Sequence, residues 1–504
     1  MKKEKRKLKT SLPKPEIQHA SPKRSLYSTW YLLGAVLAAA FLSFYNIDKR
    51  SIWYDEAFSI AYSSLNWSGL WAHIWEQEPN MCLYSVLLKL WLFFGAHEFA
   101  VRSLSALFAV ATVPVIYLIG KRLFDARVGL TAAWLLSVNA FLIRYAQEAR
   151  AYSLVLCLVC ISTYFLIRSI QEKSRKTWAI YVITSILAVY SHFFAAFVIL
   201  SHAVSILFLD RKDIPPLRDL IIIGCVLMLF LCPFGYLIVS TDSGQVNWIP
   251  ELSAKSLPDL FMNLAGREEK PIAILSLLLS LVGLISLCRM WRNPQNRLAA
   301  RRCLLVFIWL ALPIAIAMVV SLFKPIFVDR YFIVCLPALM LLAGRGLTGI
   351  HNTRIFRAAA SVTLIISMIA VITSYQSPKD DDWRGATGLI YSSAKPGDAA
   401  IFLLPYNKLA FEYYRSRQLL TDDPLVYAYP SVPFMEMLEK RNTRPLNQAL
   451  LRSLRQHNRR VWLILCDEKF SPAISERLQQ RLNVLYSFKK ASNFGGVTVL
   501  LYYD

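Results

Sequence analysis

Residues 51–59 read SIWYDEAFS and follow a long apolar segment that begins near Trp30. The stretch places two adjacent carboxylates, Asp55 and Glu56, among three aromatic side chains. Aromatic residues are common where a membrane span meets water, whereas ionisable residues beside a span often mark a functional site. The stretch therefore indicates either a solvated loop edge beside an interfacial aromatic belt, or a catalytic acid at the mouth of the first span.

The composition predicts a polytopic α-helical membrane protein. The 504 residues are 56% hydrophobic, the mean hydropathy is +0.42, and long apolar runs recur from Thr29 to Tyr375. The net charge of +23 fits positively charged cytoplasmic loops better than nucleic-acid binding. The basic segment 1–27 is too long for the start of a signal peptide, so the first span is expected to be retained.

Eleven apolar segments are expected to cross the membrane. They cover residues 28–46, 100–120, 128–145, 151–167, 178–191, 193–209, 219–240, 271–288, 303–323, 331–347 and 356–375. Cys157 and Cys160 form a CxxC pattern inside one of these segments. There they are expected to be small apolar helix residues rather than a metal or redox pair.

The charges of the connectors predict the orientation of the chain. One set carries 27 Lys and Arg against 7 acids: residues 1–27, 121–127, 168–176, 210–219, 289–302 and 344–357. The opposite set carries 11 Lys and Arg against 13 acids: residues 47–102, 144–150, 241–270 and 324–330. The positive-inside rule places the first set in the cytoplasm, with residues 1–27 as a basic tail. After eleven crossings, residues 376–504 lie outside.

The number of predicted spans depends on how two parts of the sequence are interpreted. Residues 80–96 are apolar but short, with Lys89 in the middle, and we expect an amphipathic helix at the outer surface within an external loop, 47–99. Residues 178–191 and 193–209 have no Gly or Pro between them, yet merging them into one span would invert every later loop. We therefore expect two spans that meet near His192.

Residues 376–504 have the mixed composition of a globular domain. The sequence predicts three helices, in 382–394, 407–417 and 471–482, and three strands, in 399–405, 459–466 and 495–503. We expect a small extracytoplasmic α/β domain after the transmembrane domain 28–375. Lid, acceptor-docking and stabilising roles are all open for this domain.

The predicted external connectors hold a distinct set of polar residues. Besides the two acids, they include Glu76, Glu78, Arg144, Tyr145, Gln147, Glu148, Arg150, Tyr152, His192, Lys324, Asp329, Arg330 and Tyr331. Arginines and carboxylates on one membrane face fit a site that binds an anionic headgroup and carries a base. Simpler interpretations remain: Arg144 and Glu148 are at the spacing of a helical ion pair. His192 could pack at the interface, and Arg330 with Tyr331 could be a snorkelling anchor.

A series of motifs resembles a known family. WYDEAFS, EQEPNMCLYSVLLKLW, HEFAVRSLSALFAVATVPVIYLIGKRLFDARVG, YAQEARAYSL, DRYF…LPALMLL and DDWRGATGLIYSSAKPGD occur in this order across most of residues 45–410. The series is similar to the protein O-mannosyltransferase and aminoarabinose transferase group. These are glycosyltransferases of the GT-C superfamily that use polyprenyl-phosphate sugars. The resemblance implies the GT-C fold, a catalytic transmembrane domain and a lipid-linked sugar donor.

The resemblance also implies roles for single residues. The catalytic base of the family corresponds to Asp55, with Glu56 beside it, and a second acidic position corresponds to Glu78. That acid is usually followed by two prolines, and Asn80 replaces the second one here, which puts the shape of this loop and the acceptor in doubt. Some relatives hold a metal near this acid and the histidine that corresponds to His192. A divalent metal at Glu78 and His192 is thus an open expectation.

The donor phosphate, by the same resemblance, is bound by Arg150 and by Arg330 with Tyr331. The remaining external residues Tyr145, Gln147, Glu148 and Tyr152 are expected to support the site. A phosphate leaving group needs cations more than it needs a proton, so one base and arginines suffice, and direct displacement inverts the anomeric centre. Adjacent residues of a helix point about 100° apart. Hence we expect Asp55 to be the base, and Glu56 to orient the site or to bind the acceptor.

The sequence therefore predicts an inverting glycosyltransferase of a bacterial inner membrane, whose acceptor is a lipid, a glycan or a protein. A flippase or transporter of lipid-linked sugars is one alternative, and a non-catalytic membrane scaffold is another. Transporters tend to place charges near the bilayer midplane, whereas most charges here lie at the outer span ends. A scaffold would leave the set of acids and arginines without a purpose.

Overall fold

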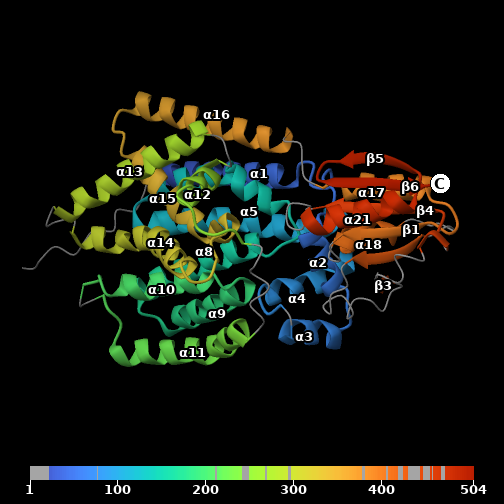
Figure 1. Ribbon diagram of the computed structural model, residues 1–504. Helices are drawn as coiled ribbons and strands as arrows, with labels where there is room; N and C mark the ends of the chain where they lie inside the picture. Colours follow the sequence, from blue (N-terminus) through green and yellow to red (C-terminus); the bar gives the residue numbers. More distant parts are fainter. Residues whose placement is uncertain are drawn as a thin grey trace, which may run out of the picture.

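Apolar runs of about 20 residues satisfy their backbone hydrogen bonds in a membrane by forming helices, and such helices make up most of this chain. The computed structural model describes residues 22–76, 78–210, 213–240, 249–266, 270–292, 297–376, 381–403, 407–417, 424–429, 443–445, 454–456, 458–466 and 472–504. Residues 1–21 of the predicted basic tail lie outside this set. The long helices run side by side, and a domain with a β-sheet lies at one end of the bundle (Figure 1).

The helical part begins at Pro22 and ends at Gln376. Its main elements are α1 (Pro22–Phe44), α5 (Glu98–Leu123), α6 (Ala126–Ser137), α7 (Ala140–Ala146), α8 (Tyr152–Glu172), α9 (Arg175–Ser191), α10 (Ala195–Ile206), α11 (Leu217–Ser240), α12 (Ser256–Gly266), α13 (Lys270–Arg292), α14 (Arg297–Ser321), the 3₁₀ helix η3 (Asp329–Cys335), α15 (Leu336–Thr348) and α16 (Thr353–Gln376). Each of the eleven expected spans coincides with one of these helices or with two consecutive ones. The predicted polytopic helical fold is thus confirmed.

Most of these spans, but not all, are long and apolar enough to cross a membrane. Seven helices of the described chain are long and apolar enough to cross a membrane, and α6 with α7, bent by 59°, form an eighth span if counted together. The other three expected spans are α1, whose part Ser28–Phe44 is a shorter apolar helix, α9 with 17 residues and α10 with 12. Cys157 and Cys160 are buried in α8, as expected.

Side-chain contacts sort the connectors into two ends of the bundle. One end gathers the connectors of the candidate site, through contacts of Arg102 with Ser51, Arg150 and Arg330 with Asp55, His192 with Tyr331, and Asn263 with Asp329. The other end gathers basic connectors, through contacts of Arg122 with Glu172, Arg127 with Phe356, Arg301 with Asp210, and Arg345 with Phe124. Successive connectors alternate between these ends, as expected for helices that cross once each.

The loop between α1 and α5 contains three helices, where the sequence analysis expected one. They are α2 (Tyr54–Ser63), α3 (Trp67–Glu76) and α4 (Cys82–Trp91), and the short 3₁₀ helix η1 (Leu92–Phe94) continues α4. The predicted amphipathic helix corresponds to α4 and η1. Lys89, which argued against a span there, donates hydrogen bonds to the carbonyl oxygens of Ser63 and Leu65. The ammonium group therefore satisfies the end of α2 and its following turn.

The C-terminal domain is an α/β structure, as predicted, with more strands than expected. Its elements are α17 (Trp383–Ser393), β1 (Ala399–Leu403), α18 (Lys408–Arg415), β2 (Leu425–Tyr429), β3 (Thr443–Pro445), β4 (Arg460–Cys466), α21 (Pro472–Leu485), β5 (Phe488–Phe494) and β6 (Val497–Tyr503). The sheet order is β3-β2-β1-β4-β6-β5, with β1 to β4 parallel to one another and β6 antiparallel to both β4 and β5. The analysis of the sequence missed β2, β3 and β5.

Helices pack on both faces of this sheet, because successive residues of a strand point to opposite faces. On β4, Trp462 and Ile464 belong to the hydrophobic core that includes α17 and α18. The intervening Val461 and Leu463 belong to a second core with α21. Helices of opposite faces thus meet neighbouring residues of one strand.

The sheet domain contacts the chain just before α2. The Tyr414 hydroxyl, on α18, accepts a hydrogen bond from the Ile52 N–H at 2.7 Å and donates one to Glu98 Oε1 at 3.0 Å. The Ser51 hydroxyl donates to the Asp381 carbonyl oxygen and accepts from the Trp383 N–H, both at 3.0 Å. The domain therefore holds the segment that leads into the SIWYDEAFS helix.

Small residues let α13 and α15 approach backbone to backbone, a packing that membrane helices use widely. A Cβ atom added to Gly346 would overlap the Leu279 carbonyl oxygen, and one added to Gly283 would overlap the Leu342 carbonyl oxygen. In contrast, a Cβ on Gly224 in α11 meets no atom within 4 Å. Glycine is therefore required where these two helices cross.

Replacing Gly346 by Ala is expected to push α13 away from α15 and to destabilise the fold by about 1–3 kcal/mol, the usual cost of overpacking. The measurement is thermal unfolding of the purified protein in detergent. Gly224→Ala is the matched control and should unfold at or slightly above the wild-type temperature. Equal unfolding temperatures for the two variants would contradict the close crossing.

Candidate active site

Helix α2 positions the two acids of the opening stretch. It begins at Tyr54 without a side-chain cap, and Asp55 and Glu56 occupy its first turn. Negative side chains are favourable there, because the free backbone N–H groups give a helix N-terminus partial positive charge. Both acids are buried, at 7% and 0% exposure. They point to different partners, as expected for neighbours on a helix.

Glu56 forms a buried ion pair with Arg102 in the first turns of α5. Its two carboxylate oxygens accept hydrogen bonds from Arg102 Nε at 2.8 Å and Nη2 at 2.7 Å. The Oε1 atom also accepts from the Ala149 N–H at 2.8 Å. A carboxylate so fully engaged has no free oxygen for a substrate. The geometry agrees with the orienting role expected of Glu56 and disagrees with binding of the acceptor.

Asp55 lies between two guanidinium groups that come from distant parts of the chain. Its Oδ2 atom is 3.8 Å from Arg150 Nη2, just before α8, and 3.7 Å from Arg330 Nη2 in η3. These distances are ion-pair contacts that exceed a normal hydrogen bond. The structure thus brings together the predicted base and both predicted phosphate ligands.

Arg150 is held in place from several sides. Its Nη1 atom donates to Ser59 Oγ at 3.2 Å, and its carbonyl oxygen accepts from Ser105 Oγ at 3.0 Å. Ser105 is in turn within 3.0 Å of the Tyr84 hydroxyl on α4. Burial, the largest single effect, opposes the charge of Arg150, but Asp55, Tyr152 and Glu78 together raise its pKa above the ordinary value. The side chain is therefore a fixed cation.

Aromatic side chains form a wall beside the arginines. The ring of Tyr331 lies 4.7 Å from that of His192, and the ring of Tyr152 lies 6.1 Å from His192 and 4.9 Å from Tyr145. Trp53 lies 5.9 Å from the guanidinium carbon of Arg330, in cation–π range. Burial, assisted by the two arginines of the site, lowers the pKa of His192 to about 3. The imidazole is thus neutral at physiological pH.

Buried polar atoms without a hydrogen-bond partner in the described chain gather at this place. They are Trp53 Nε1, Asp55 Oδ2, Arg150 Nε, Tyr152 Oη and His192 Nε2. Native proteins satisfy nearly all buried polar groups, so such atoms need an explanation. Their donors and acceptors, beside two cations, fit a site that receives a polar anionic ligand.

Glu78 lines a cavity that adjoins this cluster. The cavity has a volume of about 20 Å³, enough for one water molecule, and its lining includes Tyr62, His73, Asn80 and Arg150. Burial, with a contribution from Asp55, raises the pKa of Glu78 to about 7, although Arg150 opposes the shift. Asn80, which replaces the family's second proline, uses its side-chain oxygen to accept from the Phe193 N–H at 3.3 Å.

Two of the predicted supporting residues stabilise the fold around the site. The Gln147 amide donates to the carbonyl oxygens of Leu42, Ser43 and Tyr45, and thus satisfies the end of α1. Glu148 pairs with Arg144 at 2.6 Å, the helical ion pair that the spacing suggested. Burial raises the pKa of Glu148 although Arg144 lowers it.

The described residues around Asp55 do not form a set of metal ligands. Among the residues that the structure describes, no three side chains of the His, Cys, Asp and Glu types gather closely enough to hold one. Glu78 faces the small cavity, whereas His192 is stacked among aromatic rings. Two cations, Arg150 and Arg330, also occupy the space beside Asp55. Glu78 and His192 therefore do not make up a metal centre with the other described residues.

The sequence analysis missed Arg102, the counter-ion of Glu56. Arg102 is 2% exposed, and Nη1 and Nη2 also donate to the carbonyl oxygens of Ile47, Arg50 and Ser51. The sequence does indicate a buried partner for Arg102, because a lone arginine four residues into an apolar helix needs one. It does not indicate which acid is that partner.

Comparison with known proteins supports the resemblance drawn from the motifs. The family model for dolichyl-phosphate-mannose-protein mannosyltransferase matches residues 77–236. This range includes Glu78, Arg150 and His192. A comparison with curated protein sequences finds no match.

Solved structures with a similar fold cover nearly the whole chain. ArnT from Cupriavidus metallidurans in the apo state has a TM-score of 0.60 at 13% identity, covering 94% of this chain and 98% of ArnT. ArnT bound to undecaprenyl phosphate gives 0.59 at 14% identity, with the same two coverages. The archaeal oligosaccharyltransferase AglB from Archaeoglobus fulgidus, in complex with an inhibitory peptide and a dolichol-phosphate, gives 0.50 at 11% identity, covering 95% of this chain and 74% of AglB. The expected GT-C fold is confirmed by these matches.

Replacing Arg102 by Ala is expected to destabilise the protein by about 3–5 kcal/mol, because the change leaves the Glu56 carboxylate buried without its counter-ion. The measurement is again thermal unfolding in detergent. Arg384→Ala is the matched control: it removes an ion pair with Glu98 whose arginine is 46% exposed, which costs less than about 1 kcal/mol. Similar losses for the two variants would contradict the central role of the buried pair.

Glu78 predicts a dependence of stability on pH. Its pKa in the folded protein, about 7, exceeds the ordinary value of 4.5, so the folded state favours the protonated acid. This stabilisation is complete below about pH 4.5 and is lost as pH rises through 7. Glu78→Gln should therefore unfold at a higher temperature than wild type at pH 8, and at the same temperature near pH 4.5. The exposed Glu76, changed to Gln, should leave the difference between pH 4.5 and pH 8 as in wild type.

Proposed function

We propose that this protein is an integral-membrane, inverting glycosyltransferase. It transfers a sugar from a polyprenyl-phosphate donor to a hydroxyl group of a lipid, glycan or protein acceptor at the outer membrane face. The observation that carries the proposal is the position of the Asp55 carboxylate between the guanidinium groups of Arg150 and Arg330, at 3.8 and 3.7 Å. The fold shared with ArnT, which was solved with undecaprenyl phosphate, supports the choice of donor.

Asp55 is the general base of this reaction. Its Oδ2 atom accepts no hydrogen bond within the described chain, and the arginines approach it without closing on it. The carboxylate takes the proton of the acceptor hydroxyl as the acceptor oxygen bonds to the anomeric carbon. The bond between this carbon and the phosphate oxygen breaks at the same time, and its electron pair leaves with the phosphate. Attack opposite the leaving group inverts the anomeric centre.

Arg150 and Arg330 bind the phosphate and stabilise the charge that develops on its leaving oxygen. Guanidinium groups suit this role because they offer parallel N–H donors to two phosphate oxygens. The Tyr331 ring beside Arg330 and the Tyr152 hydroxyl, which has no hydrogen-bond partner among the described residues, extend the site on the same side. A bound phosphate replaces part of the charge that Asp55 supplies to the arginines, which leaves the carboxylate available to the acceptor.

The site faces the outer side of a bacterial inner membrane in this proposal. The basic connectors lie at the end of the bundle opposite Asp55, and the positive-inside rule assigns that end to the cytoplasm. The N-terminus is then cytoplasmic, and the sheet domain is extracytoplasmic. A polyprenyl-phosphate sugar inserted in the outer leaflet would present its headgroup at the level of α2 and η3.

Replacing Asp55 by Asn is expected to lower sugar transfer by about 10²- to 10⁴-fold, the usual contribution of a general base. Cells that lack the gene are complemented with each variant, and their lipids, glycans and proteins are compared by mass spectrometry for a difference of one sugar. Asp48→Asn, at an exposed position of the same loop, is the matched control and should restore the wild-type product.

Binding of the donor separates the roles of the site residues. With undecaprenyl phosphate as the probe, in lipid nanodiscs, Asp55→Asn should bind as wild type does. Arg150→Gln should bind roughly 10- to 100-fold more weakly, because it loses a charged hydrogen bond. A variant at Asp55 with full transfer would overturn the assignment of the base. Translocation of the lipid without a glycosylated product would identify a flippase instead, and unchanged products in both variants would identify a scaffold.

A further inference from the structure

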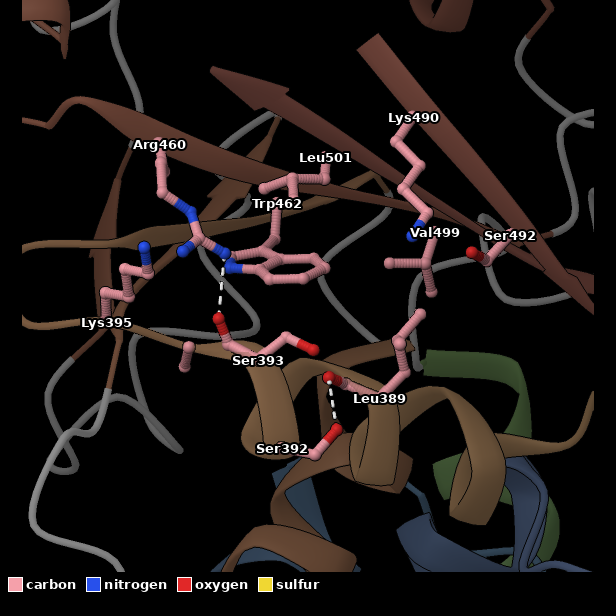
Figure 2. Close-up of a pocket in the computed structure, with 11 residues that line it drawn as sticks. Leu389, Ser392, Ser393, Lys395, Arg460, Trp462, Lys490, Ser492, Val499 and Leu501 are labelled. Carbon is pink, nitrogen blue, oxygen red and sulfur yellow. Dashed lines mark hydrogen bonds between the residues drawn. The ribbon is translucent and has the colours of Figure 1, made fainter. Parts of the chain in front are cut away.

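A pocket of about 440 Å³ lies in the sheet domain, away from the acids and arginines of α2 and η3. It is bounded by the C-terminal end of α17 and by one face of β4, β6 and β5 (Figure 2). The pocket exists because α17 covers only part of this sheet face, so that the outer strand β5 stays largely exposed. Its size suits a small ligand or one or two units of a longer one.

The lining is strongly basic. Lys395, Arg460 and Lys490 contribute three cations, which lie on both sides of Trp462 (Figure 2). Neither lysine has an ion-pair partner in the part of the chain that the structure describes. Asp398, the acid closest to Arg460, is already engaged, because its Oδ2 atom accepts from Trp462 Nε1 at 2.8 Å and from the Lys395 N–H at 3.1 Å. An excess of positive charge therefore faces the pocket.

Two of the lining groups are held rigidly. The Arg460 guanidinium donates from Nη2 to the Ser393 carbonyl oxygen at 2.8 Å, and its Nε lies 3.6 Å from Asp398 Oδ1. Trp462 is fixed by its indole N–H and is only 2% exposed, so it forms a buried wall of the pocket, whereas the half-buried Leu389 and Leu501 leave apolar surface there. The serines 392, 393 and 492 add hydroxyl groups around the rim. Rigid polar groups lose little entropy when they bind a ligand.

We propose that this pocket binds a saccharide that carries a phosphate or carboxylate group. Cations attract the anionic group, serine hydroxyls form hydrogen bonds with sugar hydroxyls, and the half-buried Leu389 and Leu501 offer an apolar surface to the carbon face of a sugar ring. Inorganic anions alone would leave this apolar surface and the serines unused. The proposal rests on the proposed function where it concerns the role of this ligand, which is the acceptor or a unit of it.

The placement of α17 supports this role. Its first residue, Trp383, contacts Ser51, four residues before Asp55, and its last residue, Ser393, lines the pocket. A helix of this length spans about 15 Å. One unit of a charged glycan can thus bind in the sheet domain while another unit lies at Asp55. This arrangement favours a glycan acceptor that is anionic over a neutral one.

Direct binding to the purified full-length protein tests the site without any transfer reaction. The probes are trigalacturonate and glucose 6-phosphate as anionic saccharides, neutral maltotriose, and inorganic phosphate, each titrated by calorimetry. We expect at least one anionic saccharide to bind about tenfold more tightly than both maltotriose and phosphate. Salt should weaken this binding. Equal affinity for maltotriose, affinity for phosphate equal to that for the saccharides, or no binding of either anionic saccharide would overturn the proposal.

Two neighbouring lysines of β5 provide a matched pair of variants. Lys490 pairs with Leu501 and faces the pocket, whereas Lys489 pairs with Tyr502 and contacts Gln479 on the opposite face. Both are exposed, so either change to Gln should preserve the fold. Lys490→Gln should weaken saccharide binding by roughly threefold, and by roughly tenfold when combined with Lys395→Gln, whereas Lys489→Gln should leave the binding unchanged. Equal effects of the two substitutions on β5 would also overturn the proposal.

The Asp55→Asn variant separates this inference from the proposed function. It should bind the anionic saccharide as wild type does, because the pocket is distant from Asp55. If the saccharide binds but no sugar transfer is found in any variant, only the proposed function fails. If transfer depends on Asp55 but no anionic saccharide binds, only the pocket assignment fails.

Discussion

The buried ion pair of Glu56 and Arg102 is the constraint on which the site depends. Removing two charges from water is costly, and the cost is offset only where every polar atom finds a partner. Here the partners are the carbonyl oxygens of residues 47, 50 and 51 and the Ala149 N–H. The pair therefore fastens α5 to the start of α2 and to the segment before α8. Residue 56 directly follows the proposed base, and residue 149 directly precedes the proposed phosphate ligand. The ion pair therefore also sets the distance between Asp55 and Arg150.

Two adjacent acids thus perform different tasks because a helix turns them apart. Glu56 faces the helical bundle, where its charge is neutralised within the protein. Asp55 faces Arg150 and Arg330, where the contacts are longer and one carboxylate oxygen has no hydrogen-bond donor in the part of the chain that the structure describes. The Glu56 carboxylate is fully hydrogen-bonded, as a structural ion pair requires. The Asp55 carboxylate is only partly hydrogen-bonded, as a base requires.

The sequence predicted what local patterns determine. Apolar length and the distribution of Lys and Arg located the helices of the bundle, including α9 and α10 on either side of His192. The motifs also identified the residue types that meet around Asp55. The partner of Glu56 was not predictable, because Arg102 is 46 residues away and several external acids could have satisfied it. Gln147 was expected at the site. The sequence does not indicate whether its amide binds a ligand or the carbonyl groups at the end of α1. Strand β5 was missed because it is exposed along most of its length and lacks the apolar alternation that identified β4 and β6.

Hydrogen bonds join the sheet domain to the segment that carries the proposed base. Tyr414 bridges the Ile52 N–H and Glu98, so one hydroxyl group links α18, the segment before α2 and the start of α5. Ser51 adds two hydrogen bonds to the chain before and within α17. The backbone that leads into Asp55 is therefore held from the bundle by Arg102 and from the sheet domain by Tyr414 and Ser51. A ligand that shifts α17 or α18 acts on this backbone within a few residues of Asp55, because these hydrogen bonds join the helices to residues 51 and 52.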